Sequence, residues 1–386
     1  MSFKKFYSYF LAEHPETLHC SPHSHHYWPD VTRAAHLAYW QDSAQGADQK
    51  WDIIFGERIP RVQQLLAQML GHPHPEQFVF APNTHELVYR IFSCFDAGKP
   101  LRILTTDGEF HSFSRQLRRI EERGNVTVER VACEPFATFG QRWEKALRAG
   151  SYDLIFISQV FFNSGVVAPW VDDWLHLVPE QTQVVIDGYH GCGALPTSLK
   201  DVADRVFYLA GSYKYLQAGE GCCFMSVPQG TLLRPEYTGW FADFANLAKP
   251  QQGPVGYADD GMRFAGATMD YSALYRLEAV LQWWHDDGLT INAIHQHVQR
   301  LQQNFLAMLD DVQHPLLNRQ TLLLHDADQH GHFFTFALES AGQVAEFAAQ
   351  LRAQGVETDY RGKRLRFGFA LYHDADDFDC LKKALS

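Results

Sequence analysis

The sequence is organised around two short stretches, Val184-Val-Ile-Asp-Gly-Tyr-His190 and Gly211-Ser-Tyr-Lys-Tyr-Leu-Gln-Ala-Gly-Glu-Gly221. The first is an apolar strand that ends in Asp187, and Lys214 follows the next apolar run along the chain. Because parallel strands place their carboxyl ends at one edge of a sheet, this acid and this amine are expected at the same edge. A carboxylate and an amine on opposite sides of one ring suit pyridoxal 5'-phosphate (PLP), whose ring nitrogen the acid keeps protonated while the amine binds its aldehyde.

Each of these two residues also has an ordinary structural explanation. Asp187 alone could cap a turn, and Lys214 alone could be a solvated loop lysine, as most single charged residues are. Their joint placement after neighbouring strands favours the cofactor site.

The fold class follows from the order of apolar runs. Seven of them alternate with longer helical stretches from about residue 76, and they are mostly uninterrupted, which is typical of strands in a largely parallel sheet. A Gly- and Pro-containing stretch after residue 228 precedes a long helical region over about 271–309, and a strand–helix–strand pattern follows. We expect an α/β protein with a large domain over 46–270 and a smaller α+β domain formed by 1–45 and 271–386. The seven runs are Phe78–Phe80, Leu101–Thr105, Val126–Val131, Leu154–Ile157, Val184–Ile186, Val206–Leu209 and Cys222–Met225, and the final pattern covers His332–Ala337, Gln343–Gln354 and Arg364–Phe369.

Composition narrows the choice of partners. The 386 residues carry a net charge of -12, so the basic excess that binds nucleic acids or anionic membranes is missing. The seven cysteines lack CxxC spacing, which argues against a disulfide framework or a thiolate zinc site. The N-terminus predicts a short amphipathic helix rather than a signal peptide, and no apolar window is long enough to span a bilayer. We therefore expect a cytoplasmic protein.

The two stretches resemble those of kynureninases, which read S-Y-K-Y-L-N-A-G and D-x-A-H where this chain has Ser212–Gly219 and Asp187–His190. Kynureninases belong to the class V group of fold-type I PLP enzymes, together with cysteine desulfurases and small aminotransferases. The resemblance runs from about residue 18 to residue 373. It implies the PLP cofactor, a small amino-acid substrate and a homodimer with active sites at the subunit boundary.

The resemblance also implies a set of cofactor contacts. It makes Lys214 the lysine that binds PLP and Asp187 the partner of the ring nitrogen. It places His190 near the phenolic oxygen and gives Tyr213 a role in holding the phosphate and relaying protons. Asn83 and Thr84, at a strand-to-helix turn, resemble the phosphate-binding pair of the family, although either could simply cap the helix.

Phe110 matches the aromatic residue that stacks on the cofactor ring. Kynureninases have Phe there and desulfurases have His, although a core phenylalanine is a competing explanation. Trp240 resembles a family tryptophan near the phosphate or substrate, but Ala242-Asp243 departs from the Gly-His that follows it in the family. Thr268 stands where class V relatives have Thr and many kynureninases have Asn, and by resemblance it serves the active site of the other subunit.

Two segments are expected to face the substrate. In Thr358–Tyr372, Arg366 best matches the arginine that pairs with the substrate α-carboxylate, with Arg361 and Arg364 as competitors. The histidine-rich segment His19–His26 lies where kynureninases carry a run that faces the substrate, and by resemblance Ser24 matches the serine of that run. His23, His25 and His26 depart from it, which indicates a changed substrate pocket. Metal binding by this segment is disfavoured because no further ligand cluster accompanies it.

The expected activity is that of a kynureninase-like hydrolase, which cleaves the Cβ–Cγ bond of L-kynurenine or 3-hydroxykynurenine to alanine and an aryl acid. The alternative is a class V aminotransferase or another PLP-dependent β-lyase on a different amino acid. Desulfurase chemistry is disfavoured because Thr358–Tyr372 contains no cysteine. A catalytically silent binding protein is a third reading, against which the intact set of Asp187 and Lys214 argues.

Overall fold

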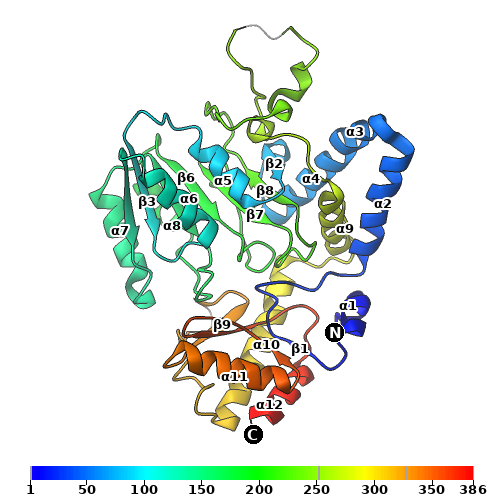
Figure 1. Ribbon diagram of the computed structural model, residues 1–386, viewed down its shortest axis with the longest axis vertical. Coiled ribbons are helices and arrows are strands. Elements are labelled where there is room, and N and C mark those ends of the chain that lie inside the picture. Colours follow the sequence, from blue (N-terminus) through cyan, green and yellow to red (C-terminus); the bar gives the residue numbers. More distant parts are fainter. Residues whose placement is uncertain (1, 251–252, 327–328, 386) are drawn as a thin grey trace.

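A seven-stranded sheet forms the centre of the larger part of the molecule (Figure 1). The computed structural model describes residues 2–250, 253–326 and 329–385. The strand order is β2-β8-β7-β6-β5-β3-β4. The bounds are β2 Phe78–Ala81, β3 Leu101–Thr106, β4 Val126–Val131, β5 Leu154–Ser158, β6 Gln183–Asp187, β7 Val206–Gly211 and β8 Cys223–Ser226.

All seven predicted apolar runs are strands of this sheet. Pairing is parallel from β4 through β3, β5 and β6 to β7, while β8 runs antiparallel to both β7 and β2. The strands β5, β7 and β8 are buried along their whole length, which explains their uninterrupted apolar sequence. The prediction of a mainly parallel α/β sheet is confirmed.

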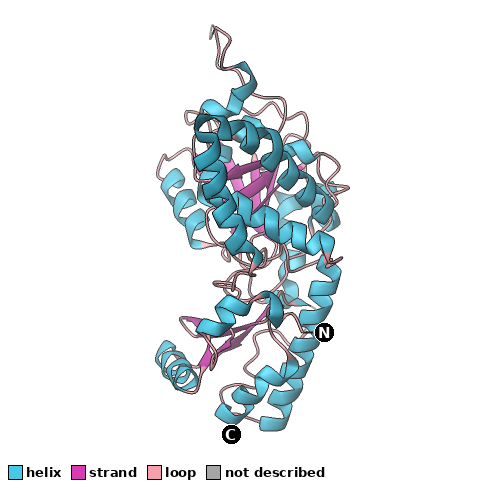
Figure 2. Ribbon diagram, turned by 90° about the vertical axis from the view of Figure 1, so that its right-hand side faces the viewer, coloured by secondary structure: helices cyan, strands magenta, loops and turns pink. Residues whose placement is uncertain are grey.

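Helices cover both faces of this sheet, as Figure 2 shows for the magenta strands between cyan helices. The helix α9 packs against α2 and α4, so the N-terminal α2 lies beside a helix from much later in the chain. The helices of this part are α2 Val31–Gly46, α3 Lys50–Ile53, α4 Ile59–Leu70, α5 Thr84–Phe92, α6 His111–Glu121, α7 Phe139–Ala149, α8 Val171–Trp174 and α9 Ser272–Asp286.

A smaller α+β part lies below the large sheet in Figure 1. It contains an antiparallel sheet of order β11-β12-β9 and a separate short parallel pair between β1 and β10, which joins two segments far apart in the sequence. A phenylalanine cluster around Phe305 fills its core. The elements are α1 Ser8–Glu13, β1 Leu18–His19, α10 Ile291–Val312, β9 Phe333–Ala337, α11 Ala341–Ala353, β10 Val356–Glu357, β11 Asp359–Arg361, β12 Arg364–Gly368 and α12 Asp379–Leu385.

The single helical region expected over 271–309 is two helices, and this prediction is corrected. The helix α9 ends at Asp286, Gly288 adopts a left-handed φ of 63°, and α10 begins at Ile291. Thr290 caps α10 by accepting a hydrogen bond from the Ala293 amide at 3.2 Å. A left-handed glycine followed by a capping threonine ends one helix and starts the next. Among the helices of the described ranges, none is long and apolar enough to cross a membrane.

Candidate active site

Lys214, Asp187 and His190 meet at the carboxyl edge of the large sheet, as the sequence predicts. Asp187 is the last residue of β6, and Lys214 lies in the loop that follows β7, the neighbouring strand. The Lys214 amine lies 2.7 Å from His190 Nε2. The Tyr189 amide donates a hydrogen bond of 2.9 Å to Asp187 Oδ1, which fixes the carboxylate at the strand end.

Burial dominates the electrostatics of these groups. It lowers the pKa of Lys214, an effect that the Asp187 charge opposes and the Arg366 and Arg361 charges reinforce. Burial raises the pKa of Asp187, against the Tyr189 hydrogen bond and the Lys214 charge. Burial also lowers the pKa of His190 well below its usual value, so its imidazole is neutral near pH 7. Because of this lowered pKa, a larger fraction of Lys214 than of a surface lysine is the neutral amine. The neutral amine is the form that attacks an aldehyde.

Aromatic rings surround the Lys214 amine. Its Nζ lies 4.9 Å from the ring centroid of Tyr189, 5.5 Å from that of Phe110 and 5.7 Å from that of Tyr213. His25, from the histidine-rich segment, stacks on Tyr213 at 5.7 Å. The predicted stacking residue Phe110 is therefore close to the Lys214 amine and only partly buried.

Arg366 sits in a buried ion-pair network behind the lysine. Its guanidinium pairs with Asp359, directly opposite across the β11–β12 register, and donates a 2.6 Å hydrogen bond to the Phe162 carbonyl. His23 is fully buried, its Nε2 lies 3.5 Å from Asp359 Oδ2, and its ring stacks on Phe333 at 4.5 Å. Sequence reasoning named Arg366 and His23 but missed Asp359, whose signal is its position opposite Arg366 in the hairpin.

The competing arginines have other surroundings. Arg364 pairs with Glu134 and donates to the Asn163 carbonyl at 3.2 Å. Arg361 is exposed and its Nη1 lies 3.4 Å from His111 Nε2. Arg366, at 2% exposure, is the buried cation of this set and lies near enough to Lys214 to lower its pKa.

Glu109 is a buried carboxyl that sequence reasoning did not select. It accepts hydrogen bonds from Thr106 Oγ1 at 2.7 Å and from Ser158 Oγ at 2.5 Å, and Ser158 pairs in register with Asp187. Burial raises the pKa of Glu109 to about 7 against these hydrogen bonds, and the Asp187 charge adds to the rise. It fixes the backbone just before Phe110.

The predicted phosphate pair lies at the start of α5. Asn83 Oδ1 accepts a 2.9 Å hydrogen bond from the Glu86 amide, so its side chain is the N-cap of this nine-residue helix. The Thr84 backbone hydrogen-bonds to the Cys223 thiol, whose sulfur lies 3.5 Å from the Tyr189 hydroxyl. The helix start therefore adjoins the lysine site, where amides and dipole favour an anion.

The surroundings of three other predicted site residues differ from those of the lysine. Ser24 is partly buried, with its Oγ 3.2 Å from His25 Nδ1. Trp240 is 42% exposed and packs on Phe241 and Phe244. Thr268 is exposed and lines a separate cavity with Arg90 and Tyr237. The single chain thus unites the lysine, acid, histidine and arginine groups, while Trp240 and Thr268 stay predictions that depend on a second subunit.

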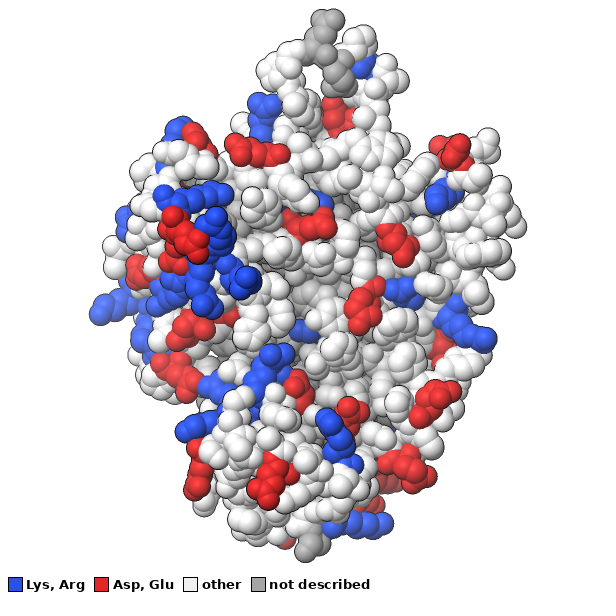
Figure 3. All heavy atoms as spheres, viewed as in Figure 1, with Lys and Arg blue, Asp and Glu red and all other residues white. Residues whose placement is uncertain are grey.

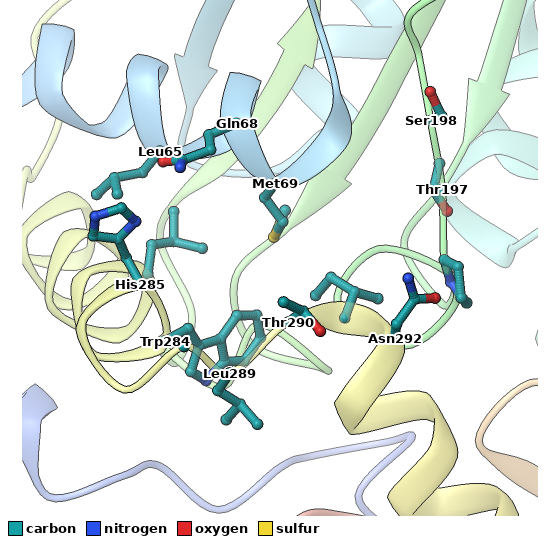
Figure 4. Close-up of a pocket in the computed structure, with 14 residues that line it drawn as sticks. Leu65, Gln68, Met69, Thr197, Ser198, Trp284, His285, Leu289, Thr290 and Asn292 are labelled. Atoms are coloured by element: carbon teal, nitrogen blue, oxygen red, sulfur yellow. The ribbon is translucent and has the colours of Figure 1, made fainter.

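A further cavity of about 520 Å³ lies between α4, α9 and the start of α10 (Figure 4). Leu65, Met69, Trp284 and Leu289 give it a largely apolar wall. None of the predicted site residues lines it, so it is distinct from the lysine site.

The lysine site fits PLP on features of this structure alone. A buried amine of lowered pKa, a carboxylate at a strand end, a partly exposed aromatic ring and a helix start lie at the same edge of the sheet. Together with the seven-stranded sheet they define a fold-type I PLP-dependent enzyme.

Comparison with known proteins gives the family. The family described as "Aminotransferase class-V" matches residues 29–380, so the chain belongs to this family. Its members depend on PLP and act on small amino-acid substrates. No curated protein sequence matches the chain.

Solved structures of this fold include C–S lyases and desulfurases. A C-DES mutant with glycine linked covalently to PLP superposes with a TM-score of 0.84 at 18% identity, covering 100% of this chain and 99% of that one. The cystine C–S lyase C-DES with cysteine persulfide gives 0.82 at 19% identity, covering 97% and 98%. A cysteine desulfurase from Thermococcus onnurineus NA1 gives 0.77 at 14% identity, covering 99% and 98%. At these identities the likeness establishes the fold.

The Asp359 network predicts a pH-dependent stability. Burial would raise the pKa of Asp359, but the hydrogen bond from His23 and the charge of Arg366 outweigh it and lower this pKa to about 2. A depressed carboxyl pKa stabilises the fold above the unfolded pKa of about 4 and loses this contribution as pH falls through 2. We expect Asp359→Asn to lower the free energy of unfolding by about 2 kcal/mol at pH 7. In calorimetric scans, the gap to wild type should persist to about pH 4 and narrow below it. A gap that widens on acidification would contradict this assignment.

Proposed function

We propose that this enzyme is a PLP-dependent β-lyase, which cleaves the bond between Cβ and the γ-substituent of an L-amino acid. The observation that carries the proposal is the buried Lys214, next to His190 and Asp187 and within electrostatic reach of Arg366. When bound, PLP supplies an electron sink that makes removal of the α-proton feasible.

The other parts of the reaction are assigned to residues of the chain. Arg366 is suited to bind the α-carboxylate by its guanidinium fork, which orients the amino group toward Lys214. The freed Lys214 amine is the base at Cα, because burial lowers its pKa toward the working range. Asp187 would hold the ring nitrogen of PLP in its protonated form. Phe110 and Tyr213 exclude water from the two sides of the lysine.

The thiol beside the site, Cys223, is buried in β8, and burial raises its pKa to about 12, so it is poorly suited to accept sulfur. Cys380, the exposed cysteine, lies in α12 of the smaller part, and five of the other six are buried. Elimination with release of the γ-group in solution therefore fits these residues better than capture of sulfur by an enzyme cysteine, the step that a desulfurase needs. The cystine C–S lyase among the solved structures supports this reading.

Kynureninase-type hydrolysis is the second candidate. It also breaks a bond to Cβ, and it is favoured by Phe110 in the stacking position and by the Ser212–Gly219 run. The departure at Thr268 weighs against it. In either case we propose a homodimer in the cytoplasm, in which Trp240 and Thr268 of one subunit complete the site of the other.

Product analysis tests the proposal. Purified holoenzyme is incubated separately with L-cystine, S-methyl-L-cysteine and L-kynurenine, and the products are identified by mass spectrometry. A β-lyase gives pyruvate and ammonia from the sulfur substrates. Alanine and anthranilate from L-kynurenine would establish the second candidate instead, and a 2-keto acid that retains the whole side chain would indicate transamination and refute both.

A further inference from the structure

We propose that Arg361 and His111 form a second anion-binding subsite at the mouth of the active site, so that the preferred substrate carries an acidic group on its side chain. The inference rests on the proposed function, because it names the substrate class of the same site. It requires one anion beyond the α-carboxylate that Arg366 is suited to bind.

A path of aromatic rings joins the lysine to this pair. The Lys214 amine lies 5.5 Å from the Phe110 centroid, and Phe110 meets Phe162 edge-on at 5.3 Å. The Arg361 guanidinium lies 5.7 Å from the Phe162 centroid. A side chain that extends from Cβ along these two rings ends at Arg361.

His111 completes the pair from the start of α6. It is the first residue of α6, next to Phe110, and its ring packs edge-on against Phe162 at 5.0 Å. Its Nε2 lies 3.4 Å from Arg361 Nη1, and burial followed by the Arg361 charge lowers its pKa. A carboxylate between the two groups would accept from the guanidinium and favour protonation of the imidazole.

Arg361 differs from Arg364 and Arg366 because its polar contact in the described part of the chain is the His111 imidazole and not a carboxylate. Arg366 has Asp359, and Arg364 has Glu134. No carboxylate of the described ranges lies within ion-pair distance of Arg361, and the nearby Asp359 already engages Arg366 and His23. An exposed guanidinium stacked on a ring and facing a neutral imidazole is therefore available to an external anion.

The surrounding surface supports recruitment of an acid. Although the chain carries a net charge of -12, Lys and Arg side chains gather on the left of the face in Figure 3 with Asp and Glu side chains among them, and residues 111–123, which include α6, have four arginines against two glutamates. A local positive field of this kind raises the encounter rate of anionic substrates.

Two ligands of nearly the same shape test the subsite. S-carboxymethyl-L-cysteine and S-carbamoylmethyl-L-cysteine differ by one side-chain charge. Each is titrated into the holoenzyme, and its dissociation constant is read from the absorbance of the bound cofactor, which does not require cleavage. We expect the acid to bind about tenfold more tightly than the amide. Arg361→Met should bring the dissociation constant of the acid to that of the amide, and Arg361→Lys should keep part of the preference.

Arg352→Met, an exposed arginine on α11, is the matched control and should keep the wild-type preference. Equal binding of the two ligands to wild type would overturn the subsite. So would an Arg361→Met variant that weakens both ligands equally, because Arg361 would then serve a group common to both. A charge preference without cleavage would reject the lyase and retain the subsite, whereas cleavage without a preference would do the opposite.

Discussion

Replacement of Lys214 by alanine is expected to abolish covalent attachment of PLP and to reduce turnover by at least about 10³-fold. Lys214 is the one buried lysine of the described ranges, and its amine is held among three aromatic rings 2.7 Å from His190. No other amine can take this position. The measurement is the absorbance band of lysine-bound cofactor in the purified variant, followed by product formation with the substrate that wild type accepts.

The control is Lys200→Ala, which removes an exposed lysine and should leave both signals unchanged. Wild type offers a second test of the same residue. Because burial lowers the pKa of Lys214, the rate of PLP uptake by apoprotein should reach half its maximum well below pH 10.5, the ordinary lysine value. Turnover of Lys214→Ala at the wild-type rate would refute the role of this lysine.

Most of the fold can be predicted from the sequence because it depends on local signals. The seven buried strands appear as apolar runs, since both faces of a parallel sheet are covered by helices. The break between α9 and α10 was missed because the helical periodicity resumes within a few residues, although Gly288 and Thr290 carry the stop and start signals. The pair β1 and β10 joins distant segments, and two-residue strands have no periodicity to detect.

The residues of the candidate site likewise fall into those that local sequence signals predict and those that depend on distant segments. Asp187 and Lys214 follow consecutive strands, so strand order alone predicts that they meet. Glu109 could not be selected, because its role depends on Ser158 from another strand. The signal for Asp359 is the hairpin register that sets it opposite Arg366, but its contact with the distant His23 has no such signal. The positions of Trp240 and Thr268 depend on a second subunit, which no pattern within one chain describes.

Replacement of Arg366 by alanine is expected to lower kcat/KM by about 100-fold or more, mainly through KM. The loss of a buried, bidentate partner for the α-carboxylate corresponds to about 3 kcal/mol. The sharper measurement is discrimination between a substrate and its α-carboxamide. Wild type should prefer the acid strongly, Arg366→Ala should bind both about equally, and Arg366→Lys should be intermediate because a lysine lacks the planar fork.

A second substitution separates recognition from folding. Arg366→Ala leaves Asp359 buried without its cation, so its melting temperature should fall, and removing that carboxylate in Arg366→Ala/Asp359→Asn should restore part of it. The restored protein should still fail to distinguish the acid from its amide, because no guanidinium is left at that position. If stability and discrimination return together, Arg366 acts on the fold alone. The exposed Arg361, which lies over the Phe162 ring, would then be the cation that binds the α-carboxylate. The substrate would accordingly bind nearer to Phe162.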